Sequence, residues 1–148
     1  MTAKGFIIGA PRSGSGKTTV TLGLIAAFRR RGVKVRTAKS GPDYIDPAFH
    51  AAASGGPGIN LDSWAMPPSL VDALVADQAG EADLLIIESS MGLFDGIPGD
   101  AGLHGAGADL AARLKLPVAP VTDVSCQSPV SYTHLRAHET VPETVSLH

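Results

Sequence analysis

Short, uninterrupted apolar runs alternate along the chain with longer segments in which apolar residues recur at helical spacing. Phe6-Ile7-Ile8 ends at Gly9-Ala10-Pro11, and Leu84-Leu85-Ile86-Ile87 ends at Glu88. Such runs predict strands that are buried on both faces, because a strand with one face in water alternates apolar and polar residues. We predict strands at residues 6–8, 33–38, 83–88 and 117–121.

The segments between these runs have the pattern of amphipathic helices. Residues 17–31 are the clearest case, with apolar side chains on one side of the helix and Gly32 as a stop signal. Further helices are predicted at residues 68–79 and 106–116, and a short one at 47–53 within a Gly-, Pro- and Asp-rich stretch, 40–62, otherwise interpreted as a functional loop. Strands alternating with helices predict an α/β fold with a doubly wound, mostly parallel sheet.

Polar residues with potential chemistry come shortly after the predicted strands. In a doubly wound sheet, ligands bind beyond the carboxyl ends of the strands. We therefore expect one shared site to contain the residues Ser13 to Thr19, Asp43, Asp46, Glu88, Asp95 and Asp123.

Composition narrows the functional classes. The 148 residues are 44% hydrophobic and 18% charged with a net charge of −2, which is typical of one globular domain and does not favour binding to nucleic acid or to an anionic membrane. The one basic cluster, Arg29-Arg30-Arg31, is interpreted as a solvated helix end. Cys126 is the single cysteine, so an internal disulfide is excluded, and no apolar run approaches the ~20 residues of a membrane helix. We predict a cytoplasmic protein.

The segment from Ser13 to Thr19 has the composition of a phosphate-binding loop between a strand and a helix. Glycines allow backbone N–H groups to turn towards a phosphate, and the start of the following helix adds a favourable dipole. The pattern departs from G-x-x-x-x-G-K-[ST], because Pro11 stands where the first glycine is expected. We predict binding of a nucleoside triphosphate, ATP with Mg²⁺, in which Lys17 reaches the β- and γ-phosphates and the Thr18 hydroxyl ligates the metal.

Four carboxylates are further candidates. Asp43 and Asp46 lie three residues apart between two prolines, which suits a metal or a substrate but also turn formation and helix capping. Glu88 ends a buried strand, where a carboxylate is costly unless it is paired, so a nearby Mg²⁺ is expected. Asp95 precedes Gly96 and by itself indicates a turn.

In combination these segments resemble a known family. The loop resembles the deviant phosphate loop of the partition-ATPase and dethiobiotin-synthetase superfamily, whose signature residue lies five before the loop lysine and is Arg12 here. With that loop, the segments 40–47 (Ser-Gly-Pro-Asp-Tyr-Ile-Asp-Pro), 60–62 and 91–96 (Met-Gly-Leu-Phe-Asp-Gly), together with 117–128, resemble cobyrinic acid a,c-diamide synthases, in particular the hydrogenobyrinic-acid branch. The resemblance covers about residues 6–128 and implies a dethiobiotin-synthetase-like P-loop NTPase fold.

The resemblance implies an ATP-dependent amidoligase of cobalamin biosynthesis. A corrin carboxylate attacks the γ-phosphate to give an acyl phosphate, which ammonia converts to the amide. The implied catalytic residues are Lys17, Asp43, Asp46, Glu88 and Asp95, and Thr18, Asp43 and Glu88 are the implied metal residues. The implied nucleotide-binding residues are Arg12, Ser13, Gly14, Ser15, Gly16, Lys17, Thr18 and Thr19. The division of roles among Asp43, Asp46 and Asp95 stays open.

The family draws ammonia from a C-terminal glutaminase domain with a cysteine nucleophile, which this chain does not contain. We interpret residues 1–128 as an incomplete synthetase domain and 129–148 as a tail that is artefactual or disordered. Cys126 is no substitute for the missing nucleophile. His134 and His138 have metal-ligand spacing but lack the glutamate of H-E-x-x-H, so no metal site is assigned to them. The chain alone is expected to be inactive in glutamine-dependent synthesis; a homodimer is left open.

Three other functions are compatible with the loop: a dethiobiotin-synthetase-like ligase, a partition-type switch ATPase, and a fragment that holds a nucleotide without turnover. The segment 91–96 argues against the ligase. Arg12 in place of the signature lysine, together with the low positive charge, argues against the switch ATPase.

Overall fold

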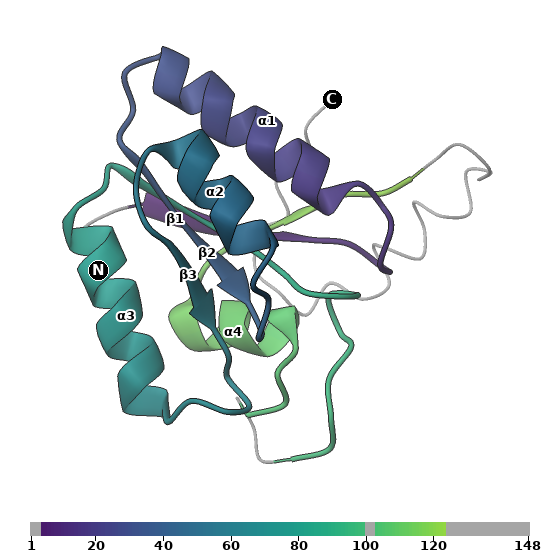
Figure 1. Cartoon of the computed structure of the whole chain (residues 1–148). Coiled ribbons are helices and arrows are strands. Elements are labelled where there is room, and N and C mark those ends of the chain that lie inside the picture. The colour runs from purple at the N-terminus through teal and green to yellow at the C-terminus, as the bar shows by residue number, and fades with distance from the viewer. Residues whose placement is uncertain (1–3, 100–102, 124–148) are drawn as a thin grey trace.

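The computed structural model describes residues 4–99 and 103–123. The sequence interpretations that concern Cys126, His134, His138 and the tail 129–148 lie outside these residues. Strands and helices alternate almost throughout, in the order β1 (Lys4–Gly9), α1 (Lys17–Arg30), β2 (Val35–Ser40), α2 (Asp46–Ser54), β3 (Gly58–Leu61), α3 (Pro68–Gly80), β4 (Leu84–Glu88), α4 (Gly107–Leu114) and β5 (Val118–Pro120) (Figure 1).

The strands form one five-stranded parallel sheet in the order β3-β2-β4-β1-β5. This arrangement confirms the predicted α/β fold with a doubly wound parallel sheet. In the register of β4, Glu88 lies opposite Ile8 of β1 and opposite Lys39 of β2. The acidic end of β4 is therefore in the middle of the sheet, flanked on both sides.

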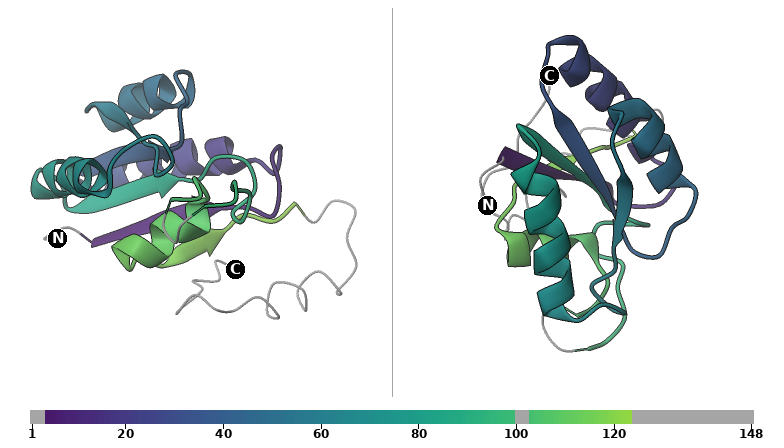
Figure 2. Two further views of the ribbon diagram at one scale, coloured as in Figure 1. Left: turned by 90° about the horizontal axis from the view of Figure 1, so that it is seen from below. Right: turned by 60° about the vertical axis from the view of Figure 1, so that its left-hand side comes forward.

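Helices cover both faces of the sheet. Ile8 of β1 packs with Ile25 of α1 on one face, whereas its neighbour Ile7 packs with Val75 of α3 and Leu110 of α4 on the other. Figures 1 and 2 show α1 and α2 side by side, with α4 on the opposite side of the sheet. Ile7 and Ile8 are both fully buried, which explains why the strand sequences are continuous apolar runs.

The topology opens a crevice between β1 and β4. These neighbouring strands lead into helices on opposite faces, because β1 continues into α1 and β4 into α4. The loops after the two strands consequently diverge at the carboxyl edge of the sheet, which is where doubly wound folds bind their ligands.

The structure corrects the predicted element list in one respect. The sequence predicts a loop at residues 58–61, but they form β3, which lies at the edge of the sheet and, among the described strands, pairs with β2 alone. Four residues in a Gly- and Pro-rich stretch are too few to show the periodicity of a strand. The strand forms because these residues pair with β2. The other boundaries differ by at most two residues. β2 spans Val35–Ser40 rather than 33–38, and α4 ends at Leu114, before Lys115 in a left-handed conformation. Among the described residues, no helix is long and apolar enough to span a membrane.

Candidate functional site

A cleft of about 760 Å³ lies at the carboxyl edge of the sheet. Its walls come from the loop after β1, the end of β2, the start of α2 and the segment after β4. The cleft is lined by Ser13, Gly14, Gly16, Lys17, Thr18, Thr19, Lys39, Pro42, Asp43, Tyr44, Asp46, Glu88, Ser90 and Met91.

The loop between β1 and α1 owes its shape to two glycines. Gly14 has φ 77° and Gly16, directly before α1, has φ 85°, and a Cβ at either position would meet no atom within 4 Å. The left-handed backbone, rather than crowding, therefore favours glycine at both positions. The Ser15 hydroxyl donates to the Arg12 carbonyl oxygen at 3.0 Å and closes the turn. The first turn of α1 faces the cleft, as a phosphate site requires.

Lys17 begins α1 and is buried. Its Nζ donates to the carbonyl oxygen of Met91 at 2.6 Å and to that of Arg12 at 3.3 Å. Burial, reinforced by the charge of Lys39, lowers the pKa of Lys17 below its ordinary value. Met91 has φ 44°, an uncommon conformation for a residue with a side chain, and it delivers its carbonyl to the loop lysine.

Glu88 is the most deeply buried charged residue of the cleft, with no exposed surface. Its Oε1 accepts hydrogen bonds from Thr18 Oγ1 at 2.6 Å and from Lys39 Nζ at 3.0 Å. Its Oε2 lies 2.7 Å from His50 Nε2. Burial alone would raise the pKa of Glu88, but the hydrogen bonds from His50 and Thr18 and the charge of Lys39 outweigh it and lower the pKa to about 2.

Lys39 connects the two carboxylates of the cleft. Its Nζ lies 2.5 Å from Asp46 Oδ2 and 3.0 Å from Glu88 Oε1. Burial opposes the charged amine, yet the hydrogen bond to Asp46 and the charge of Glu88 prevail, so the pKa of Lys39 is raised. Lys39 is thus a cation held by carboxylate oxygens.

The oxygens around Thr18 suit a small divalent cation. Thr18 Oγ1 is 2.6 Å from Glu88 Oε1 and 3.4 Å from Asp46 Oδ2. Neighbouring ligands of an octahedral Mg²⁺ are about 3.0 Å apart, given Mg–O bonds of about 2.1 Å. Within residues 4–99 and 103–123, no three His, Cys, Asp or Glu side chains form a metal-binding group. Mg²⁺ does not require such a group, because proteins usually bind it through one or two carboxylates together with the phosphates of a substrate.

The remaining candidate residues lie in other positions. Asp43 lines the cleft, and its Oδ1 accepts the backbone N–H groups of Ile45 and Asp46 at 2.8 and 3.2 Å. These hydrogen bonds hold the turn that leads into α2 and lower the pKa of Asp43 in spite of its burial. Asp95 accepts the backbone N–H of Gly92 at 2.8 Å, outside the cleft lining. The Arg12 side chain is 70% exposed and pairs with Asp123 at 3.6 Å, so these two charges meet at the surface.

Sequence reasoning missed two residues of this cluster, Lys39 and His50. Both carried a signal: Lys39 directly follows the predicted strand 33–38, and His50 is four residues after Asp46, one helical turn along the chain. Neither position stands out without the neighbouring strand and helix in place.

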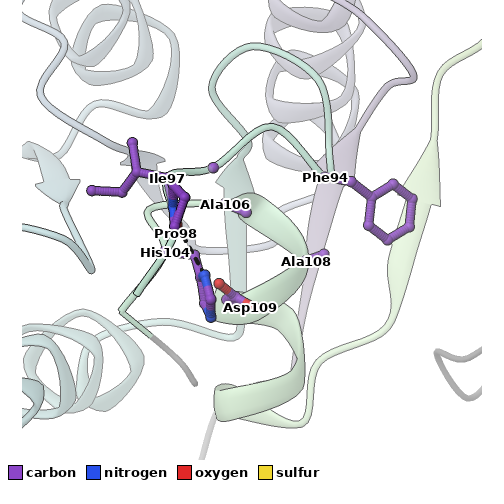
Figure 3. Close-up of a pocket in the computed structure, with 8 residues that line it drawn as sticks. Phe94, Ile97, Pro98, His104, Ala106, Ala108 and Asp109 are labelled. Carbon is purple, nitrogen blue, oxygen red and sulfur yellow. Dashed lines mark hydrogen bonds between the residues drawn. The ribbon is translucent and has the colours of Figure 1, made fainter. Parts of the chain in front are cut away.

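A second, smaller pocket of about 310 Å³ lies between the loop after β4 and α4 (Figure 3). His104 Nδ1 is 3.0 Å from the carbonyl oxygen of Ile97, and the Phe94 ring lies apart from the other labelled side chains. This pocket shares no lining residue with the larger cleft, and none of the predicted site residues lies in it.

Comparison with known proteins agrees with this geometry. Residues 6–114 match the family model described as the CobQ/CobB/MinD/ParA nucleotide binding domain. The chain is 66% identical over 128 residues to hydrogenobyrinate a,c-diamide synthase of Mesorhizobium japonicum, which covers 86% of this chain and 29% of that protein. It is 61% identical over 133 residues to the synthase of the same name from Agrobacterium fabrum, covering 90% of this chain and 30% of that protein.

The chain therefore spans about 30% of the length of these relatives and is similar to their N-terminal part, which confirms the resemblance found in the sequence. A parallel sheet with its switch point between β1 and β4, a glycine loop leading into α1, and a family match over residues 6–114 together show that this chain belongs to the family of CobQ/CobB/MinD/ParA nucleotide binding domains.

Proposed function

We propose that the cleft binds ATP with Mg²⁺ and that the protein uses it to amidate the a- and c-carboxylates of hydrogenobyrinic (or cobyrinic) acid. The observation that carries the proposal is the meeting of Lys17, Thr18, Asp46 and Glu88 at the end of a glycine loop, in one cleft. The substrate comes from the names of the relatives, which are hydrogenobyrinate a,c-diamide synthases.

The loop and Lys17 supply the positive side of the site. Ser13, Gly14 and Gly16 of the loop line the cleft together with the start of α1, where an anion is favoured. Lys17 currently donates to two carbonyl oxygens. A phosphate oxygen is a stronger acceptor than a neutral carbonyl, so bound nucleotide would compete for the same ammonium group.

Thr18, Asp46 and Glu88 are the side chains that would hold Mg²⁺, which supplies positive charge to the phosphates. Asp46 takes the place that the sequence interpretation gave to Asp43, because Asp46 Oδ2 is the oxygen that approaches Thr18. Lys39 contacts the same two carboxylates and is our candidate for balancing their charge when the metal is absent.

The proposed reaction has two steps. A corrin carboxylate oxygen bonds to the γ-phosphorus while the bond to the leaving ADP oxygen breaks. The nitrogen of ammonia then attacks the acyl carbon, the carbon–oxygen bond to phosphate breaks, and the nitrogen loses a proton to give the amide. Lys17 offsets the negative charge on the transferring group, and this electrostatic term dominates catalysis of phosphoryl transfer. The ammonia would come from a glutaminase domain of the whole protein.

Nucleotide binding is tested by calorimetry with Mg²⁺-ATP. We expect binding by the wild-type chain, loss of detectable binding in Lys17→Ala, and unchanged binding in Lys34→Ala, because the Lys34 side chain is exposed and outside the cleft lining. Equal affinities for wild type and Lys17→Ala would contradict the proposed site.

Amidation is tested by ADP release with hydrogenobyrinic acid and ammonium. Release that requires the corrin supports an amidoligase, whereas release without it favours a switch ATPase. Binding without any release would indicate a chain that only holds the nucleotide. We expect glutamine-dependent amidation from the whole protein and not from this chain alone.

A further inference from the structure

His50 is a buried polar residue that contacts the proposed metal site from behind. It lies on α2, one helical turn after Asp46, so the two side chains share a face of the helix. Its imidazole has no exposed surface, and Nε2 is 2.7 Å from Glu88 Oε2. Its Nδ1 has no hydrogen-bond partner among the described residues.

The direction of this hydrogen bond follows from its partner. The Glu88 carboxylate is bonded to Lys39 and Thr18 and is ionised, so both of its oxygens accept only. His50 Nε2 must therefore carry the proton and donate. In the part of the chain that the structure describes, His50 is the one group bonded to Oε2, while Thr18 and Lys39 both bond to Oε1.

This division of partners determines how the carboxylate is turned. The last side-chain torsion of a glutamate is broad, so an unrestrained carboxylate rotates between many orientations. The bond from His50 restrains Oε2 and leaves Oε1 beside the Thr18 hydroxyl, which is another oxygen of the proposed metal site. Carboxylates that bind metals are commonly held by such outer hydrogen bonds, and losing one weakens metal binding about 10- to 100-fold.

We infer that His50 is a positioning residue, whose Nε2–H holds Glu88 so that Oε1 and the Thr18 hydroxyl face the divalent cation of a bound nucleotide. The inference rests on the proposed function, because it requires a metal–nucleotide complex in the cleft. A purely structural His50 would stabilise the fold without affecting the metal selectively.

The experiment separates metal binding from nucleotide binding. The affinity for ATP is measured by calorimetry once with EDTA and once with excess Mg²⁺, and the ratio of the two affinities reports what the metal adds. We expect His50→Leu to lower this ratio by about tenfold while the affinity measured with EDTA is unchanged. His50→Gln, whose amide nitrogen replaces Nε2 as a donor, is expected to retain most of the ratio.

Val75→Ala is the matched control for lost stability. Val75 is a core residue of α3 on the other face of the sheet, so its truncation weakens the fold without touching Glu88. We expect an unchanged ratio in this variant. If His50→Leu does not fold, His50→Asn replaces it. The asparagine side chain is too short to bring its amide nitrogen to Glu88 Oε2, so we expect the same decrease in the affinity ratio.

The outcomes distinguish the inference from the proposed function. A wild-type chain whose ATP affinity does not depend on Mg²⁺ would overturn both. A wild type that depends on Mg²⁺, with the same ratio in His50→Leu or His50→Asn, would overturn the inference alone. A His50→Gln variant that loses as much as His50→Leu would show that the donated hydrogen bond is not the cause.

Discussion

At the scale of single residues, Glu88 shows how the fold keeps a charge in its interior. The carboxylate is fully buried at the end of β4, and three side chains from different elements, Thr18, Lys39 and His50, satisfy it. Removal of one partner from a buried ionic group is strongly destabilising, because the remaining charge is left unpaired. This network stabilises Glu88 as an anion before any metal binds.

The lowered pKa of Glu88 predicts a contribution to acid stability. Its pKa falls from an ordinary value of 4.5 to about 2, so the folded state binds this proton less readily than the unfolded state. The contribution is present above about pH 4.5, amounts to at most about 3 kcal/mol, and is lost as the pH falls towards 2.

We expect Glu88→Gln to lack this dependence, so that its free energy of unfolding declines less than that of wild type between pH 5 and pH 2. Urea unfolding across this range, in EDTA to exclude metal, provides the measurement. Asp77→Ala, at an exposed position of α3, is the control. Parallel pH profiles for wild type and Glu88→Gln would contradict the prediction.

At the scale of elements, the segment after β4 is packed directly onto the phosphate loop. A Cβ on Gly92 would lie 2.7 Å from the Pro11 carbonyl oxygen and 2.7 Å from Asp95 Oδ2. The neighbouring Met91 carbonyl receives Lys17 at 2.6 Å. The glycine therefore permits the close approach of two loops that follow adjacent strands.

Gly92→Ala is expected to force these loops apart, which lowers both the free energy of unfolding and the affinity for Mg²⁺-ATP. Gly23→Ala is the contrasting variant, because a Cβ at this position inside α1 meets no atom within 4 Å. It should stabilise the protein by about 0.5–1 kcal/mol through the higher helix propensity of alanine. Urea unfolding and calorimetry of both variants provide the comparison; an affinity in Gly92→Ala equal to that of wild type would refute the coupling of the two loops.

At the scale of the whole molecule, the cleft is assembled from segments that follow β1, β2 and β4 together with the start of α2. No one segment contains the site, so its geometry depends on the order β3-β2-β4-β1-β5. A ligand that bridges these segments binds the folded state and not the unfolded chain, and it stabilises the fold by mass action.

We expect Mg²⁺-ATP at 100 times its Kd to raise the free energy of unfolding by about 2.7 kcal/mol. Lys17→Ala, unfolded at the same nucleotide concentration, should show no such increase. Thermal or urea unfolding with and without nucleotide measures the difference. An equal increase in the wild type and the variant would place the bound nucleotide outside this cleft.

Much of this protein could be predicted from local sequence patterns. Continuous apolar runs determine buried parallel strands, because both faces of the sheet are covered, and the residues Gly14 and Gly16 before Lys17 indicate a phosphate loop by their backbone freedom and position. The polar residues after the strands were expected to meet, since the carboxyl ends of parallel strands lie at one edge of the sheet.

Only the tertiary structure decided which of these residues face one another. Asp43 and Asp46 are both aspartates of one loop, yet Asp43 accepts backbone N–H groups of the turn before α2, whereas Asp46 contacts Thr18 and Lys39. The hydrogen-bond partners of Glu88 lie 38 to 70 residues away from it in the sequence. The edge strand β3 is ordered by its pairing with the neighbouring strand β2. Local spacing specifies the elements because their backbone and burial preferences are local, whereas the contacts of a buried charge depend on packing between distant segments.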